Sequence, residues 1–186
     1  MNTKTVAWQS ILVFPSIWVG ACDIASNSPS NDIELPVERF LVFYFQGYGR
    51  GLPDESQLAE LASFVTPELL NLFEAAVEGE DCYLEKINYQ GPGPIQGDLF
   101  SSLFEGGTSA TYRQIAQETN TAIFEVEWIN DSPVAERPFA WKDQILLVRT
   151  ADGWLIDDFV HQGTWEFMMK GNVSQILGAV SEECVG

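Results

Sequence analysis

The spacing of apolar residues changes near residue 108 of this 186-residue chain, and this change limits the folds that the chain can adopt. Before it, apolar residues recur every three to four positions between short polar segments, which is typical of amphipathic helices. After it, four stretches alternate apolar and polar residues, which is typical of half-buried strands. Helices followed by consecutive strands predict an α+β fold with an antiparallel sheet of about four strands.

Boundary residues place these elements more closely. Thr66 and Pro67 are a typical helix N-cap and first helical residue, and Asp54 can cap a shorter helix before them. We also expect Asp98 to cap one or two helical turns that end at Gly106. The predicted helices cover residues 36–47, 55–64, 67–79 and a short segment near the C-terminus, and the predicted strands cover residues 108–117, 121–130, 139–150 and 153–161.

The first 21 residues have the pattern of a secretory signal peptide. Lys4 is the only charged residue before Asp23, and the apolar stretch that follows Lys4 is shorter than the roughly 20 residues that a membrane span needs. Residues 19–22 read Val-Gly-Ala-Cys and resemble the lipobox of bacterial lipoproteins, in which the signal is cut before the cysteine and the thiol is diacylated. The alternatives are an uncut signal anchor, or a cleaved signal that leaves Cys22 free.

The lipobox predicts a lipid-anchored protein of the bacterial envelope that faces the periplasm. Asp23 resembles an inner-membrane retention signal, but this rule varies among bacteria and leaves the inner and outer membranes open. The chain then divides into a signal peptide (1–21), a flexible tether rich in Ser, Asn and Pro (22–34) and one α+β domain (35–186).

The three cysteines become an even set once Cys22 carries lipid. Cys82 and Cys184 remain, and the envelope is an oxidising compartment, so a disulfide between them is one prediction and two unpaired thiols are the other. No metal-ligand spacing involves these residues, and with a single histidine in the chain a zinc site has almost no support.

The charge of the chain excludes some partners. It has 27 acidic residues against 9 Lys and Arg, a net charge of −18, which disfavours nucleic acids and docking on anionic headgroups through a basic patch. The glycine-rich segments lack the lysine and the context of a phosphate-binding loop, so we expect no cofactor.

A few polar residues on the predicted strands could carry chemistry. Asp157 and Asp158 are neighbours on one strand, so one of them should face the core, where it either bonds loop amides or an arginine such as Arg149, or acts as a general acid or base. By alternation, His161 shares a face with Asp157. Such a pair can transfer protons, but this spacing is also a common coincidence.

Other candidate residues have plain structural alternatives. Ser101 and Ser102 lack the surroundings of a nucleophile and suit capping or packing. The tryptophans on and after the strands either line a ligand cavity or fill the core; these are Trp128, Trp141, Trp154 and Trp165.

Several motifs together resemble a known family. They are RFLVFYF, LASFVTPELLNLFEAA, GDLFSSLFEG, WKDQILLVRTADGWLIDDF and a final glycine with a short helix, spread over residues 37–177. In this order they are similar to the bacterial lipoproteins of domain-of-unknown-function family 3828. The resemblance implies export, lipid anchoring and a cone like that of nuclear transport factor 2, in which a curved sheet wraps helices. The family has no agreed activity, so no catalytic residue is carried over.

Three classes of function follow. The first is a non-enzymatic, membrane-anchored module that binds an envelope protein, with a periplasmic immunity protein against a cell-wall-degrading toxin as a sharper variant. The second is a ligand-binding or enzymatic cone with polar groups at its mouth, and the third is a structural domain with an exposed apolar patch on the sheet. The candidate pocket or motif residues are Tyr44, Asp98, Trp141, Asp143, Trp154, Asp157, Asp158 and His161.

Overall fold

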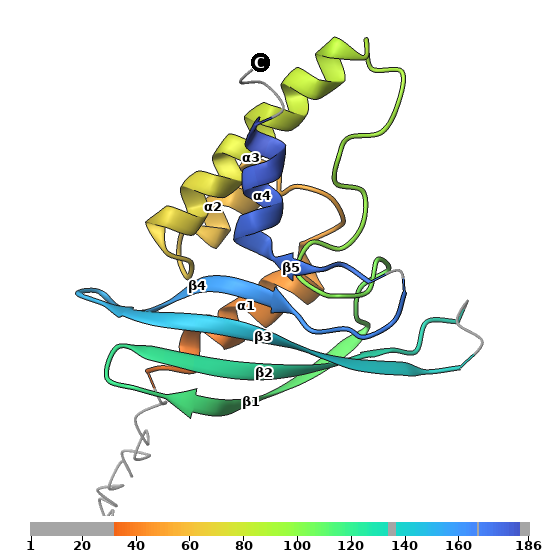
Figure 1. The fold of residues 1–186 in the computed structure, drawn as a ribbon. Helices are drawn as coiled ribbons and strands as arrows, with labels where there is room; N and C mark the ends of the chain where they lie inside the picture. Colours follow the sequence, from red (N-terminus) through yellow and green to blue (C-terminus); the bar gives the residue numbers. More distant parts are fainter. Residues whose placement is uncertain (1–31, 134–136, 167, 183–186) are drawn as a thin grey trace, which may run out of the picture.

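The computed structural model describes residues 32–133, 137–166 and 168–182 of the chain. Within them it confirms the α+β prediction, with the elements in the order shown in Figure 1. The elements are α1 (Leu35–Gln46), α2 (Glu55–Leu61), α3 (Pro67–Lys86), β1 (Ser109–Gln117), β2 (Thr121–Asn130), β3 (Phe139–Thr150), β4 (Gly153–His161), β5 (Gly171–Asn172) and α4 (Val173–Ser181). The predicted signal peptide, Cys22, most of the tether and Cys184 lie outside the described residues.

The five strands form one antiparallel sheet in chain order, from β1 at one edge to β5 at the other. The short β5 was not predicted, because two residues carry no periodic pattern. Figure 1 shows the helices on one side of the curved sheet, and in this part of the chain the opposite face has no helix over it. None of the described helices is long and apolar enough to span a membrane.

The core lies between the sheet and α1. Helix α1 buries one side, which includes Phe40 and Phe43, while Val42 and Phe45 on its other side remain 49% and 43% exposed. The Phe40 ring lies 4.6 Å from the Phe159 ring, 5.3 Å from the Phe100 ring and 6.5 Å from the Trp128 ring, measured between centroids. Ile33, which we assigned to the tether, is only 4% exposed and belongs to this core, so the packed part of the chain includes at least this residue.

Helix α3 runs to Lys86, so the predicted end near Gly79 is wrong. Gly79 lies inside α3 and does not end it. Its role is to allow close packing against α4. A Cβ atom at this position would clash with the backbone of Val180, where α4 crosses α3. The helix therefore continues through a glycine that lets the two backbones approach closely.

The segment 97–107 forms bends and turns, and not the helical turns that we expected. Asp98 does cap it, since its Oδ1 accepts the N–H groups of Phe100 and Ser101, both at 2.8 Å. Other backbone groups of the segment bond outside it, as in the 3.0 Å bond from the Met169 N–H to the Ser102 carbonyl. These long-range partners replace the helical hydrogen bonds.

A β-bulge in β4 changes which residues face the core. Leu146 pairs with Asp158 and Leu147 pairs with Ile156, so Asp157 is an extra residue in the ladder. As a result Asp157 is exposed, whereas Asp158, at 7% exposure, and His161 are buried. One of the two aspartates is buried, as predicted, but the expectation that Asp157 shares a face with His161 is wrong, because simple alternation does not continue through a bulge.

Candidate functional site: a groove at the open edge of β3

Strand β3 extends beyond β4 at one end of the sheet. The β3–β4 ladder begins at the pair Gln144–Val160, so within the described chain residues 139–143 pair with β2 on one side and have no recorded strand partner on the other. The chain leaves β4 and passes beside this extension toward β5 (Figure 1).

Between the free edge of β3 and residues 162–165 lies an open groove with a volume of about 510 Å³. We call it the β3-edge groove. Its walls combine aromatic, acidic and basic side chains, among them Glu125, Glu127, Phe139, Trp141, Lys142 and Trp165.

Three aromatic rings form a corner in this groove. Phe139 and Trp141 are stacked, with centroids 5.7 Å apart and an interplanar angle of 24°. Trp165 stands nearly perpendicular to both, at 89° to Phe139 and 75° to Trp141. Trp141 continues inward onto Trp128 at 6.4 Å, so the corner is anchored in the core, while Phe139 remains 41% exposed.

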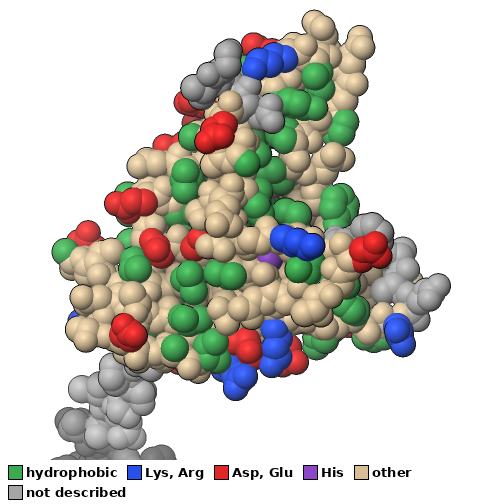
Figure 2. Space-filling model, in the orientation of Figure 1, with side chains coloured by type: hydrophobic (Ala, Val, Ile, Leu, Met, Phe, Trp, Pro, Cys, Tyr) green, Lys and Arg blue, Asp and Glu red, His purple; other side chains and the backbone are tan. Residues whose placement is uncertain are grey.

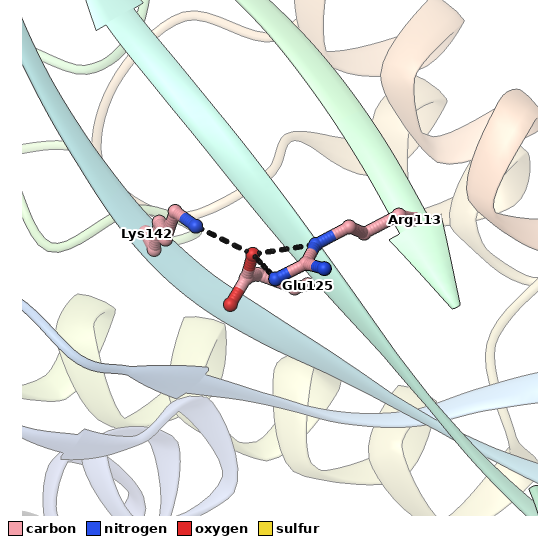
Figure 3. Close-up of polar contacts among 3 residues, drawn as sticks. All are labelled: Arg113, Glu125 and Lys142. Carbon is pink, nitrogen blue, oxygen red and sulfur yellow. Dashed lines mark hydrogen bonds and ion pairs between the residues drawn. The ribbon is translucent and has the colours of Figure 1, made fainter. Parts of the chain in front are cut away.

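The charged wall lies on the face of the sheet that is turned away from the helices. Figure 3 shows a single carboxylate oxygen of Glu125 held by Arg113 and Lys142, with Arg113 Nη2 and Lys142 Nζ both at 2.8 Å. These hydrogen bonds, from Lys142 first and then Arg113, hold the pKa of Glu125 below its usual value. Glu127 is exposed and makes no recorded hydrogen bond or ion pair with the rest of the described chain, so its carboxylate is available to a ligand.

The buried carboxylate of Asp143 accepts hydrogen bonds from both walls of the groove. The Trp141 indole Nε1–H donates to Asp143 Oδ2 at 3.0 Å, and the Gln162 N–H donates to Oδ1 at 2.8 Å. The backbone and hydroxyl of Ser102 also donate to this carboxylate. Trp141 on β3 and the chain after β4 are thus positioned by one buried carboxylate.

Gly163 lets the second wall lie close to the core. Its N–H donates to Ser102 Oγ at 2.9 Å. A Cβ atom here would lie 2.6 Å from the Trp165 ring and 2.8 Å from Ser102 Cβ, closer than side chains tolerate. Both predicted serines are buried, and Ser102 has the packing and hydrogen-bonding role that we preferred.

Tyr44 and Asp98 form a second buried contact away from the β3-edge groove, and both line a separate pocket of about 210 Å³. The Tyr44 hydroxyl donates to Asp98 Oδ2 and accepts the Gly107 N–H at 2.9 Å. Burial raises the pKa of Asp98 to about 6, despite the hydrogen bonds from Tyr44 and two N–H groups. Burial and the nearby Asp98 raise the pKa of Tyr44.

His161 is buried and does not form the predicted pair with Asp157. Its Nε2 lies 3.1 Å from the Leu99 carbonyl, and its Nδ1 has no hydrogen-bond partner among the described residues. Burial lowers the pKa of His161, although Asp143 and Asp158 act in the opposite direction. Asp157 instead accepts a 3.3 Å hydrogen bond from the Thr66 hydroxyl.

The remaining candidates, Asp158 and Trp154, lie in two other parts of the molecule. Asp158 accepts the Ser174 N–H at 3.1 Å and the Ser174 hydroxyl at 2.6 Å, so it caps the start of α4. Trp154 is buried at the opposite end of β4, where the Arg149 guanidinium lies 6.0 Å from its ring centre. The eight candidates therefore do not form one pocket, and only Trp141 and Asp143 help to build the groove.

Sequence reasoning missed most of the groove, above all Glu127, Phe139 and Lys142. One signal was present: the predicted strand 139–150 is three residues longer than its hairpin partner 153–161. In a hairpin with a tight turn, that excess leaves the start of the longer strand without a partner.

The space between sheet and helices is filled by aromatic side chains, including Phe40, Phe100, Phe159 and Trp128. This filling counts against a deep cone pocket with convergent polar groups. No group of His, Cys, Asp and Glu among the described residues is arranged to hold a metal ion. Family models, curated proteins and solved structures were compared with the chain, and none of them matches it.

Proposed function

We propose that this protein is a lipid-anchored protein of the bacterial envelope that binds another protein at the β3-edge groove. The observation that carries the proposal is the open edge of β3 beside a groove whose walls are held in place by Asp143. Strand edges with unpaired amides and exposed aromatic side chains are common features of protein-binding sites. The free carboxylate, the aromatic faces and the backbone edge all suit binding.

The uncovered face of the sheet supports this proposal. Half-buried aliphatic side chains pair across neighbouring strands on this face, as in the pairs Ile123–Leu146 and Val148–Leu155. Figure 2 shows hydrophobic side chains that reach the surface over the strands. An apolar area of this kind next to the groove would enlarge the contact with a partner.

The N-terminal pattern completes the proposal. Lipid on Cys22 would hold the domain at a membrane surface, since two or three acyl chains give stable anchoring. Kinship with domain-of-unknown-function family 3828, and with the cone of nuclear transport factor 2, belongs to the same proposal. The α+β order and the curved antiparallel sheet are compatible with such a cone.

The test is photocrosslinking in cells that make the full-length protein. Benzoyl-phenylalanine replaces Phe139 in the groove, and in a matched control it replaces Tyr89, which is 66% exposed beyond the end of α3. We expect one dominant envelope protein to be crosslinked from position 139 and not from position 89. A Cys22→Ala variant should lower the yield, because it removes the anchor.

Equal crosslinking from both positions, or none from position 139, would overturn the proposal. If position 139 gives no crosslink while Cys22→Ala still releases the protein from the membrane, the lipid anchor stands and the groove is not the binding site.

A further inference from the structure

We infer that the segment bound in the β3-edge groove is an extended basic peptide. Its main chain adds to β3 as a strand, its Lys or Arg side chain reaches Glu127 on the face turned away from the helices, and the side chains next to this residue lie against the exposed part of Phe139. This inference rests on the proposed function, because it names the chemistry of the partner at the same groove.

The backbone of β3 carries the first part of the inference. Residues 139–143 are held in strand geometry by β2, yet no strand pair is recorded on their other side within the described chain. At about 3.4 Å per residue, this edge spans roughly 17 Å, enough to pair with four or five residues of an extended peptide. Peptides that add to a free sheet edge are a general recognition mode.

The facing wall leaves the edge open because its own polar groups are bonded elsewhere. The N–H groups of Gln162 and Gly163 donate to the side chains of Asp143 and Ser102, not to the backbone of β3. The space between this wall and β3 is the groove of about 510 Å³. The chain after β4 is therefore held beside β3 without completing the ladder.

The side-chain part follows from the two faces of this edge. On the face turned away from the helices, Glu127 offers a free carboxylate, while Lys142 is already engaged by Glu125 at 2.8 Å. On the inner face, Phe139 is the exposed part of the aromatic corner, at 41%, because Trp141 is stacked between Phe139 and Trp128. Successive side chains of an extended peptide point to opposite faces, so a basic side chain beside Glu127 leaves its apolar neighbours against the exposed part of Phe139.

The charge of the whole chain acts in the same direction. With a net charge of −18, the protein attracts basic partners and repels acidic ones over several ångströms of solution. A basic side chain is therefore favoured beside Glu127 over a neutral or acidic one.

The experiment uses the full-length protein in detergent and synthetic peptides as probes. The first probe is acetyl-Thr-Val-Arg-Val-Thr-amide, and its matched control has Glu in place of Arg. We expect the Arg peptide to bind at least tenfold more tightly, by titration calorimetry, and to slow hydrogen exchange of alternate amides within residues 139–143. A ligand held only by its side chain would leave those amides unchanged.

N-methylation tests the backbone pairing directly. A strand directs alternate N–H groups to its two edges, so methyl groups on one alternate set should weaken binding about three- to tenfold per lost hydrogen bond, and on the other set should not. Glu127→Gln should reduce the preference for Arg over Glu. Glu118→Gln, in the turn at the opposite end of the sheet, is the control variant and should leave it unchanged.

Equal binding of the two peptides, no binding, or binding without protection of residues 139–143 would overturn the inference. If the peptides fail while Phe139 still crosslinks to a partner, the extended basic peptide is wrong and the proposed function stands. If both fail, the groove is not a protein-binding site.

Discussion

Three buried carboxylates, on Asp98, Asp143 and Asp158, each accept two backbone N–H groups. All three were candidate pocket residues, and the structure places each at a point where an irregular segment or a helix start needs an acceptor. A carboxylate in such a position satisfies buried donors that water cannot reach. The acidic residues that looked most suited to chemistry are the ones that position the chain.

Asp98 should make stability depend on pH in an unusual direction. Its folded pKa of about 6 lies above the unfolded value of 3.8, so between these values the folded protein binds more protons. Its stabilising contribution is present below about pH 4 and is lost as the pH rises through 6. Replacing Asp98 with Asn removes this titration, so the unfolding free energy of the native protein, relative to that of Asp98→Asn, should fall between pH 4.5 and 7.5.

Urea unfolding of the two proteins at several pH values measures this difference. The opposite contribution of His161, whose pKa is lowered by burial, is common to both proteins and cancels. Parallel pH profiles for the two proteins would show that Asp98 keeps an ordinary pKa in the fold.

The first and last residues of an element were predicted correctly where residues within that element determine them. Strands β2, β3 and β4 begin and end at the predicted residues, because alternation and turn residues are local signals. Helix α3 and the segment 97–107 were predicted less well, because their ends depend on contacts with α4, β3 and the chain near Met169. The bulge at Asp157 is a further case, since it depends on pairing between β3 and β4.

Asp158 should stabilise the start of α4, and Asp157 should not. Asp158→Ala leaves the Ser174 N–H and hydroxyl and the Asn172 amide without their acceptor, which we expect to lower the unfolding free energy by about 1–3 kcal/mol. Asp157→Ala is the neighbouring control, because this side chain is exposed and makes one long hydrogen bond to Thr66.

Thermal and urea unfolding of both variants measure the contrast. If the two substitutions lower the unfolding free energy by similar amounts, the two aspartates stabilise the protein through the bulge and not through the cap on α4.

At the scale of the whole molecule, α3 and α4 leave the sheet side by side and point the same way (Figure 1). They touch at Gly79, beside Val180 and Ser181. Cys82 lies three residues after Gly79 and is disulfide-bonded, with its partner outside the described residues. Cys184 lies three residues after Ser181, which favours the predicted pairing with Cys82, since both helices advance in the same direction.

A bond between Cys82 and Cys184 would close a loop of roughly 100 residues, for which about 2–5 kcal/mol of stabilisation is expected. Cys82→Ser, Cys184→Ser and the double variant should therefore lose the same stability, because each breaks the same bond. Cys22→Ser should leave the unfolding free energy unchanged. If Cys22→Ser instead matches Cys82→Ser, the disulfide partner is Cys22 and the lipoprotein proposal fails with it.

The sequence by itself determined the α+β order, strands β1 to β4, α1 and the helix starts at Asp54 and Thr66, because these depend on periodicity and capping among neighbouring residues. Only the tertiary structure decided that Asp157 turns outward, that Gly79 lies inside a helix, and that Asp143 and Asp158 hold backbone groups in place, whereas the cap at Asp98 was predicted from the sequence. It also decided the groove, because an unpaired edge depends on where a neighbouring strand stops and where the following chain is held. Such contacts join residues far apart in the chain, so no local pattern specifies them.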